Sequence, residues 1–147
     1  MCSSDLNLKP FRLTAHDDNR CAKGAYVIQD DEDAQISLFA SGSEVEIIIA
    51  AAEILAQENI PTRVISVPCF ELFMQQSKAY KREVRGNTPI HIGVEAAIRQ
   101  GWSDIIGSDA IFIGMDSFGA SAPYQELYAH FGITAENIAS QAKVEGI

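Results

Sequence analysis

Short apolar runs alternate along this chain with segments of helical periodicity, and this alternation restricts the possible folds more than any other feature. The runs are rich in β-branched residues and end at glycine, proline or short polar turns, as strands do. Strands that are joined through helices pair in parallel, so the order predicts an α/β domain with a mainly parallel sheet of five strands. The five predicted strands are residues 25–28, 36–40, 62–67, 90–94 and 110–114.

The first two strands are separated only by the acidic run at residues 30–33, without a helix between them. This spacing predicts an antiparallel hairpin at the start of the sheet. The acidic run lacks the spaced glycine and distal glutamate of a calcium loop, so we interpret it as a solvated turn.

The length of 147 residues suits one domain, at roughly 150 residues per domain, and 47% hydrophobic residues are enough to fill one core. Residues 1–20 are polar and have no sustained period, so we expect an arm or a non-native leader there. The folded domain is predicted to occupy residues 21–147.

Charge and hydropathy exclude several classes of partner. Eleven Lys and Arg against twenty Asp and Glu give a net charge of −9, which repels nucleic acid and anionic membrane surfaces. The longest apolar stretch, residues 45–56, is interrupted by Glu46 and Glu53 and is shorter than the ~20 residues that span a bilayer. The chain starts without an export signal, and its three cysteines cannot all pair, so we expect a soluble cytoplasmic protein.

Helices are predicted between and after the strands. Residues 44–58 form a broad apolar helix that Ser43 is placed to cap, and its width indicates that two sides are covered. Short helices are expected within residues 70–85, and a further helix at 96–100. Pro123 opens the next helix, and Thr134 is placed to cap the last one.

Candidate binding residues lie where strands end, because ligands of open α/β sheets bind beyond the carboxyl ends of the strands. The first loop is Ser41-Gly42-Ser43-Glu44, which is either a structural cap or a small anion or effector site. It has one glycine where dinucleotide-binding turns have three, and no lysine as in a phosphate-binding loop. The cap is the simpler reading.

A second candidate loop follows the last strand and contains Asp116, Phe118, Gly119 and Ser121. It is a possible effector or interface loop, although Ser121 on its own is most simply a helix cap.

Glu95 ends an otherwise apolar strand and has no partner evident in the sequence. It is either a structural salt bridge or helix cap, or a carboxylate of a site or interface. No histidine pair has the spacing of zinc ligands. His91 is predicted to be a partly buried strand residue, and Cys69 a small core residue. The residues by themselves show no catalytic constellation.

Several strings, in the right order, resemble the C-terminal domain of transketolases, and the resemblance covers residue 21 to the end. The strings are KGAYVI (23–28), SGSEVE (41–46), RVISVP (63–68), VEAA (94–97), GMDSFGASAP (114–123) and FGITAENI (131–138).

The resemblance implies a three-layer domain and a parent enzyme of the pentose phosphate pathway. Transketolases are cytoplasmic homodimers that move a two-carbon ketol unit between sugar phosphates with thiamine diphosphate and a divalent metal, Mg or Ca. The family binds the diphosphate and metal through a GDG motif in its first domain, and no GDG string occurs in these 147 residues. No catalytic, cofactor-binding or metal-binding residue is therefore carried over, and this chain alone is expected to bind neither group and to be inactive.

The resemblance also implies the partners, which are the other transketolase domains and a second protomer. The broad apolar helix at 44–58 fits a docking role toward them. The polar start of the chain leaves open a truncated reading frame or a separately encoded subunit of a split thiamine diphosphate enzyme. A free-standing regulatory module that binds a small effector is the remaining alternative.

Overall fold

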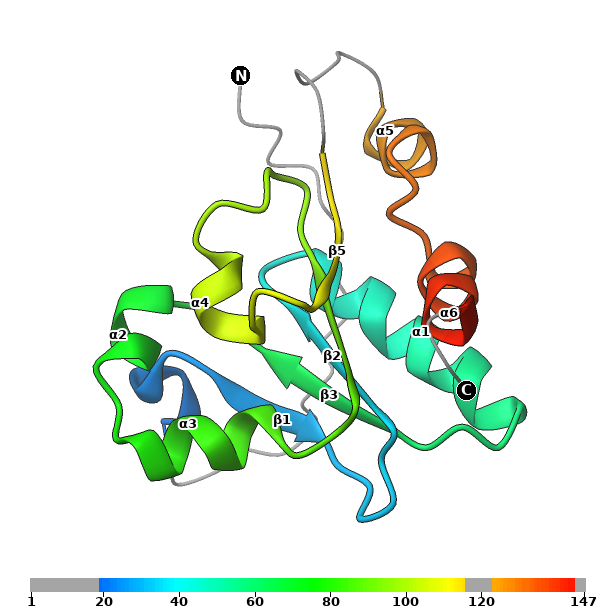
Figure 1. The fold of residues 1–147 in the computed structure, drawn as a ribbon. Coiled ribbons are helices and arrows are strands. Elements are labelled where there is room, and N and C mark those ends of the chain that lie inside the picture. Colours follow the sequence, from blue (N-terminus) through cyan, green and yellow to red (C-terminus); the bar gives the residue numbers. More distant parts are fainter. Residues whose placement is uncertain (1–18, 116–122, 145–147) are drawn as a thin grey trace.

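A five-stranded sheet forms the middle layer of the domain (Figure 1). The computed structural model describes residues 19–115 and 123–144. The strands lie in the order β1-β3-β2-β4-β5, with β1 antiparallel to β3 and all other pairs parallel. The elements in chain order are η1 (Arg20–Lys23), β1 (Tyr26–Gln29), β2 (Ile36–Ala40), α1 (Glu44–Gln57), β3 (Thr62–Ser66), α2 (Phe70–Met74), α3 (Lys78–Arg85), β4 (Ile90–Val94), α4 (Trp102–Ile106), β5 (Ile111–Ile113), α5 (Tyr124–His130) and α6 (Ala135–Val144).

The predicted hairpin is wrong, although one antiparallel strand is present. β1 pairs with β3, where Tyr26 faces Ser66, and β2 lies between β3 and β4. Burial explains the difference. All five residues of β2 are buried, so this strand needs a neighbour on each side, whereas the residues of β1 are half-buried or exposed and suit an edge.

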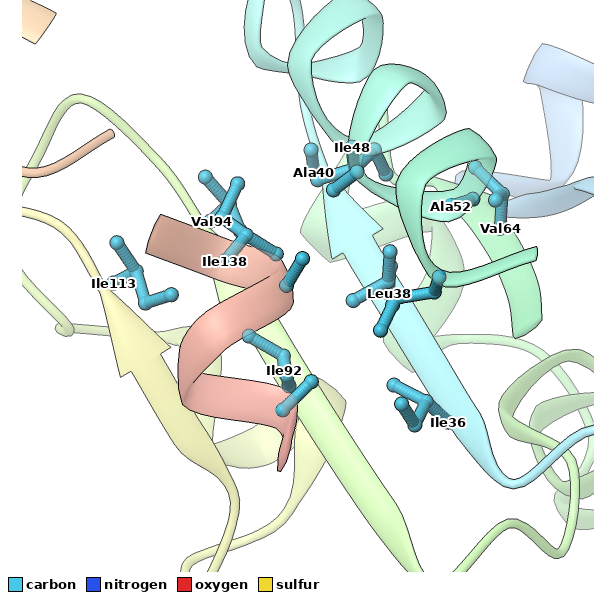
Figure 2. Packing of buried hydrophobic residues seen from close by; sticks show 14 of the residues in the cluster. Ile36, Leu38, Ala40, Ile48, Ala52, Val64, Ile92, Val94, Ile113 and Ile138 are labelled. Atoms are coloured by element: carbon cyan, nitrogen blue, oxygen red, sulfur yellow. The ribbon is translucent and has the colours of Figure 1, made fainter. Parts of the chain in front are cut away.

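Helices cover both faces of the sheet, which makes the three layers expected from the sequence (Figure 1). Successive side chains of a strand point to opposite faces. Leu38 and Ile92 therefore pack in the core beneath α1 and α6, as Figure 2 shows for Ile48 and Ile138 of these helices. Phe39 points the other way, into a second core that includes Phe73 and Trp102 beneath α2, α3 and α4.

α1 confirms the predicted broad apolar helix. Its stripe of Val45, Ile48, Ala52 and Leu55 is buried against the sheet, and α6 packs along it as a second cover. Each such large aliphatic side chain contributes about 1.5–3 kcal/mol when it is fully buried. No large apolar side chain of α1 is exposed, so the expected docking role of this helix is not supported.

No helix forms at residues 96–100, where one was predicted; α4 begins at Trp102 instead. The backbone after β4 continues to pair with the end of β5. Glu95 N–H donates to Ile113 O at 3.2 Å, and Met115 N–H donates to Ala97 O at 2.9 Å. These bonds hold the segment beside the end of β5, where its backbone groups are not free to form a helix.

The remaining helices agree with their sequence signals. Two short helices, α2 and α3, fill residues 70–85, and α5 follows Pro123. Thr134 caps α6 as predicted, because its Oγ1 accepts a hydrogen bond from Asn137 N–H at 3.3 Å.

Among the described residues, no helix is long and apolar enough to cross a membrane.

Candidate functional site

The best candidate site lies at the carboxyl ends of β2 and β4, which are neighbouring parallel strands. The chain leaves β2 toward α1 on one face of the sheet and leaves β4 toward α4 on the other face. Two adjacent strands whose connections part in this way mark a topological switch point, which is where open α/β sheets bind ligands. The loop from Ser41 to Glu44 follows β2, and Glu95 follows β4.

Ser41 and Glu95 meet at this switch point. Ala40 is in register with Val94, so the next residue of each strand lies opposite the other. Ser41 Oγ donates a hydrogen bond to Glu95 Oε2 at 2.5 Å. Glu95 makes no salt bridge within residues 19–115 and 123–144, and it precedes no helix, because α4 begins seven residues later at Trp102. Its partner is a serine hydroxyl that sequence reasoning did not assign to it.

Glu44 belongs to a second set of hydrogen bonds in the same place. Its side chain is 3% exposed, and Tyr128 of α5 donates its hydroxyl to Glu44 Oε1 at 2.7 Å. Ser43 Oγ lies 2.9 Å from the Tyr128 oxygen and 3.2 Å from Glu44 Oε2. The carboxylate also sits in the first turn of α1, where the helix dipole favours negative charge.

The expected capping role of Ser43 is wrong. Ser43 does precede α1, but its backbone is already helical and its side chain makes no cap hydrogen bond. The hydroxyl is used by Tyr128 and Glu44 instead. Gly42 supplies the tight turn before it with a φ of 51°, in the left-handed region that glycine adopts readily.

The surroundings of this group raise the pKa of two of its members, Tyr128 and Glu95. Burial raises the pKa of Tyr128 to about 12; the hydrogen bond from Ser43 opposes this shift, and Glu44 adds to it. Burial also raises the pKa of Glu95, opposed by the Ser41 hydrogen bond and reinforced by the charge of Glu44. We call Ser41, Ser43, Glu44, Glu95 and Tyr128 the acidic cluster.

The chemistry of the acidic cluster disfavours one earlier alternative. Two carboxyl groups, Glu44 and Glu95, belong to the cluster, and their negative charge disfavours an anion at the Ser41 to Glu44 loop. The cluster offers hydroxyl groups and carboxylate oxygens. Its hydrogen bonds tie the end of β2 to the end of β4, and α1 to α5.

Other predicted residues lie apart from this cluster or outside the described residues. Asp116, Phe118, Gly119 and Ser121 fall within 116–122, which the structure does not describe, and so does the expected cap at Ser121.

The two single residues weighed from the sequence lie elsewhere. His91 is half-buried, and its Nδ1 lies 2.9 Å from Ile106 O, as expected of a strand histidine. Cys69 is half-buried and not a core residue; its Sγ lies 3.4 Å from Glu71 Oε2. Within the described ranges, no group of three metal-ligating side chains is close enough to hold an ion.

Tyr128 is the site residue that sequence reasoning missed. The sequence placed it on the apolar face of a predicted helix, together with Leu127 and Phe131. The available signal was its hydroxyl, because a tyrosine on a buried helix face usually needs a hydrogen-bond partner.

A search against protein families gives one match that spans most of the chain. Residues 24–134 match the model described as the transketolase-like C-terminal domain. The chain belongs to this family. The fold predicted from its resemblance to transketolases is thus confirmed, including the mixed sheet of five strands.

Transketolases are also found among individual proteins and structures. The chain is 48% identical over 140 residues to a transketolase of Cereibacter sphaeroides, covering 95% of this chain and 21% of that protein. A transketolase structure from Leishmania mexicana superposes with a TM-score of 0.75 at 40% identity, covering 83% of this chain and 18% of that one. A structure titled split gene transketolase, inactive beta4 tetramer, has a TM-score of 0.66 at 16% identity, which shows the shared fold alone. The chain therefore spans about a fifth of the length of the curated relatives it matches.

Proposed function

We propose that this chain acts as the C-terminal domain of a transketolase and supports two-carbon ketol transfer between sugar phosphates without catalysing it alone. One observation carries the proposal: the match takes up 95% of this chain but 21% of the Cereibacter sphaeroides relative, and it falls on the C-terminal domain of the family. Thiamine diphosphate and a divalent metal would then be bound by the other domains of the full-length enzyme.

The acidic cluster supports a structural role in such an enzyme. Its donors and acceptors are largely satisfied by one another. By joining two strand ends and two helices, it fixes the loop from Ser41 to Glu44. We propose that this loop and the loop from Asp116 to Ser121 form part of the contact with other domains.

Exposed apolar side chains support contacts with the other domains and with a second protomer. Among the described residues, the large ones are Leu72 (38% exposed), Met74 (40%), Ile98 (56%), Tyr124 (41%) and Val144 (75%). Leu72 and Met74 lie together on α2, while Tyr124 begins α5 near the acidic cluster. Contacts between domains bury side chains of this kind.

The domain limits and the compartment stay proposals of the same kind. We propose that residues 21–147 form the transketolase-like domain and that residues 1–20 are an arm or leader. A net charge of −9 supports a cytoplasmic protein that binds neither nucleic acid nor membrane surfaces.

Complementation in trans tests the proposed function. The purified chain is assayed with xylulose 5-phosphate, ribose 5-phosphate, thiamine diphosphate and Mg²⁺, alone and mixed with the Cereibacter sphaeroides transketolase truncated before the matching segment. We expect no turnover by the chain alone and turnover in the mixture above that of the truncated relative. Turnover by the chain alone would overturn the proposal.

A regulatory module that binds a small molecule is the second candidate. The position of the acidic cluster at the switch point between the ends of β2 and β4 favours it. Its ligand would be neutral or cationic, given the two carboxylates. Saturable binding of such a metabolite to the purified chain, abolished in Glu95→Gln, would favour this module over the structural role.

A further inference from the structure

Basic side chains are concentrated on α3, far out of proportion to the rest of this acidic chain. Four of the eleven Lys and Arg lie in this one helix: Lys78, Lys81, Arg82 and Arg85. Their positions are i, i+3, i+4 and i+7, so they share one face of the helix. Val84 lies off this face and is buried in the second core. The net charge of −9 makes this face a local exception.

None of these four side chains forms a salt bridge with a carboxylate of the described residues. Among residues 19–115 and 123–144, the salt bridges are Arg63 with Asp30 and Lys143 with Glu58. Lys81 Nζ donates instead to the backbone oxygen of Met74 at 3.0 Å. The guanidinium of Arg85 donates to the backbone oxygen of Asp104. Positive charge that is not paired with a carboxylate attracts anions to the surface that carries it.

A hollow of about 270 Å³ lies beside this basic face, between α3 and β4. It is lined by the four basic residues of α3 together with Gly86 and His91, and no carboxylate takes part in its lining. Glu83, the single acidic residue of α3, borders a different hollow together with Asp30 and Arg63. The hollow is therefore positively charged and suited in size to a small anion.

Two polar atoms beside the hollow have no hydrogen-bond partner. They are Arg85 Nε and His91 Nε2, and they are the buried side-chain nitrogen and oxygen atoms without a partner in the part of the chain that the structure describes. Buried polar groups are nearly always paired, so two unpaired atoms on residues that line one hollow indicate a missing partner. Arg85 Nε can only donate, and an anionic oxygen is the acceptor that it would gain. His91 Nδ1 donates to Ile106 O, which leaves Nε2 of the neutral ring as an acceptor, and the P–OH group of a singly protonated phosphate is a donor that it would gain.

We propose that the hollow between α3 and β4 binds a phosphate-bearing anion, either inorganic phosphate or the phosphate group of a monoester. Phosphate oxygens are the acceptors that guanidinium and ammonium groups prefer, and several cations around one hollow suit a dianion better than a carboxylate. The site is separate from the acidic cluster and does not depend on the proposed structural role. The proposed site would bind an anion, which the acidic cluster is not suited to do.

Calorimetric titration of the purified chain tests this proposal, with ionic strength held constant by sodium chloride. The probes are inorganic phosphate, ribose 5-phosphate and unphosphorylated ribose. We expect saturable binding of a phosphate-bearing probe, with Kd in the range of about 0.1–10 mM, and no binding of ribose. Tighter binding of ribose 5-phosphate than of phosphate assigns the site to a monoester, and equal or weaker binding assigns it to free phosphate. Absence of saturable binding for both phosphate probes overturns the proposal.

Matched variants locate the binding. Lys78→Gln combined with Lys81→Gln should weaken binding by about tenfold or more, because two charged donors are lost. The double substitution of the same lysines by arginine keeps the charge and should retain binding. Lys143→Gln removes one positive charge from α6 and should leave the Kd within about twofold, as exposed pairs contribute little. An equal loss in Lys143→Gln would mean general charge attraction and would contradict a specific site.

A spectroscopic readout separates binding in the hollow from binding elsewhere. The ring proton signals of His91, which lines the hollow, should shift on phosphate titration with the calorimetric Kd. The signals of His130, an exposed residue of α5, should stay unchanged at constant pH. Movement of both histidines together, or of His130 alone, would overturn the assignment to α3.

Discussion

Replacing Tyr128 with phenylalanine removes the hydrogen bonds that join α5 to Glu44 and Ser43 at the start of α1. The change removes the hydroxyl that donates to Glu44 Oε1 at 2.7 Å and keeps the aromatic ring in place, so no cavity forms. Glu44 is 3% exposed, and water cannot replace the lost donor. A hydrogen bond to a charged group contributes about 1.5–3 kcal/mol, and Tyr128 is only half-buried, so we expect a loss of about 2 kcal/mol.

Urea denaturation at pH 7 measures this loss as a fall in the free energy of unfolding. In a thermal melt, the same loss corresponds to a decrease in Tm of about 4–8 °C for a domain of this size. Tyr124→Phe is the matched control, because it changes an exposed tyrosine of the same helix whose hydroxyl makes no hydrogen bond to the described residues. The control should stay within about 0.5 kcal/mol of the wild type.

The difference between wild type and Tyr128→Phe should also depend on alkaline pH. The folded pKa of Tyr128 is about 12, against an ordinary value of 10.0. Below pH 10 the hydroxyl is protonated in both the folded and the unfolded state, and the difference is constant. Between pH 10 and 12 the unfolded chain loses this proton first, so the wild type loses stability and the difference shrinks. An equal effect of the two phenylalanine substitutions, or a difference that is constant up to pH 12, would refute the reasoning.

Two further predictions concern the strand ends and the turns. Glu95→Gln mimics the protonated carboxyl that burial favours, so its stability relative to the wild type should rise as the pH increases above 4.5, the ordinary pKa of the carboxyl, because the unfolded wild type loses this proton first; a constant gap in urea titrations would contradict this. Gly24→Ala should destabilise the domain by several kcal/mol and Gly42→Ala by only about 1 kcal/mol, although both glycines have positive φ. At Gly24 the new Cβ would lie 2.2 Å from Phe73 N, whereas at Gly42 the nearest atom, Glu44 Oε2, would be 3.8 Å away. Comparable losses of stability in thermal melts would show that steric space does not determine the destabilisation.

The helices and strands that bury an apolar stripe could be predicted from the sequence, because periodicity records burial directly. α1 is an example, because the spacing of its apolar residues, among them Val45, Ile48 and Leu55, predicted both a buried stripe and burial on two sides. The sheet and α6 cover these two sides. The pairing of strands was harder. Proximity in the sequence favoured a hairpin between the first two strands, but the burial of β2 on both sides placed it in the centre of the sheet.

The error at residues 96–100 has a tertiary cause. The sequence after β4 is compatible with a helix, but backbone hydrogen bonds to Ile113 and from Met115 hold it beside β5. Such bonds form between segments more than fifteen residues apart, and a local pattern does not record them. Arg99 strengthens the arrangement by donating to the backbone oxygens of Ser108 and Ala110 at 2.8 and 2.9 Å.

The candidate site could be predicted in part. The rule that sites lie beyond the carboxyl ends of parallel strands selected Ser41 and Glu95, and the register of β2 with β4 brings them together. Tyr128 could not be assigned to the site, because its position depends on how α5 folds back over the start of α1. That contact joins residues 84 positions apart in the sequence.

Grafting tests the central claim most directly. The segment of the Cereibacter sphaeroides transketolase that matches this chain is replaced by this chain's residues 24–144, and kcat/KM for ketol transfer is compared with that of the parent enzyme and of the enzyme lacking the segment. If the chain is a transketolase C-terminal domain, the graft should recover activity within about tenfold of the parent, and Gly24→Ala in the graft should remove that recovery. A folded graft that is as inactive as the truncated enzyme would contradict the account.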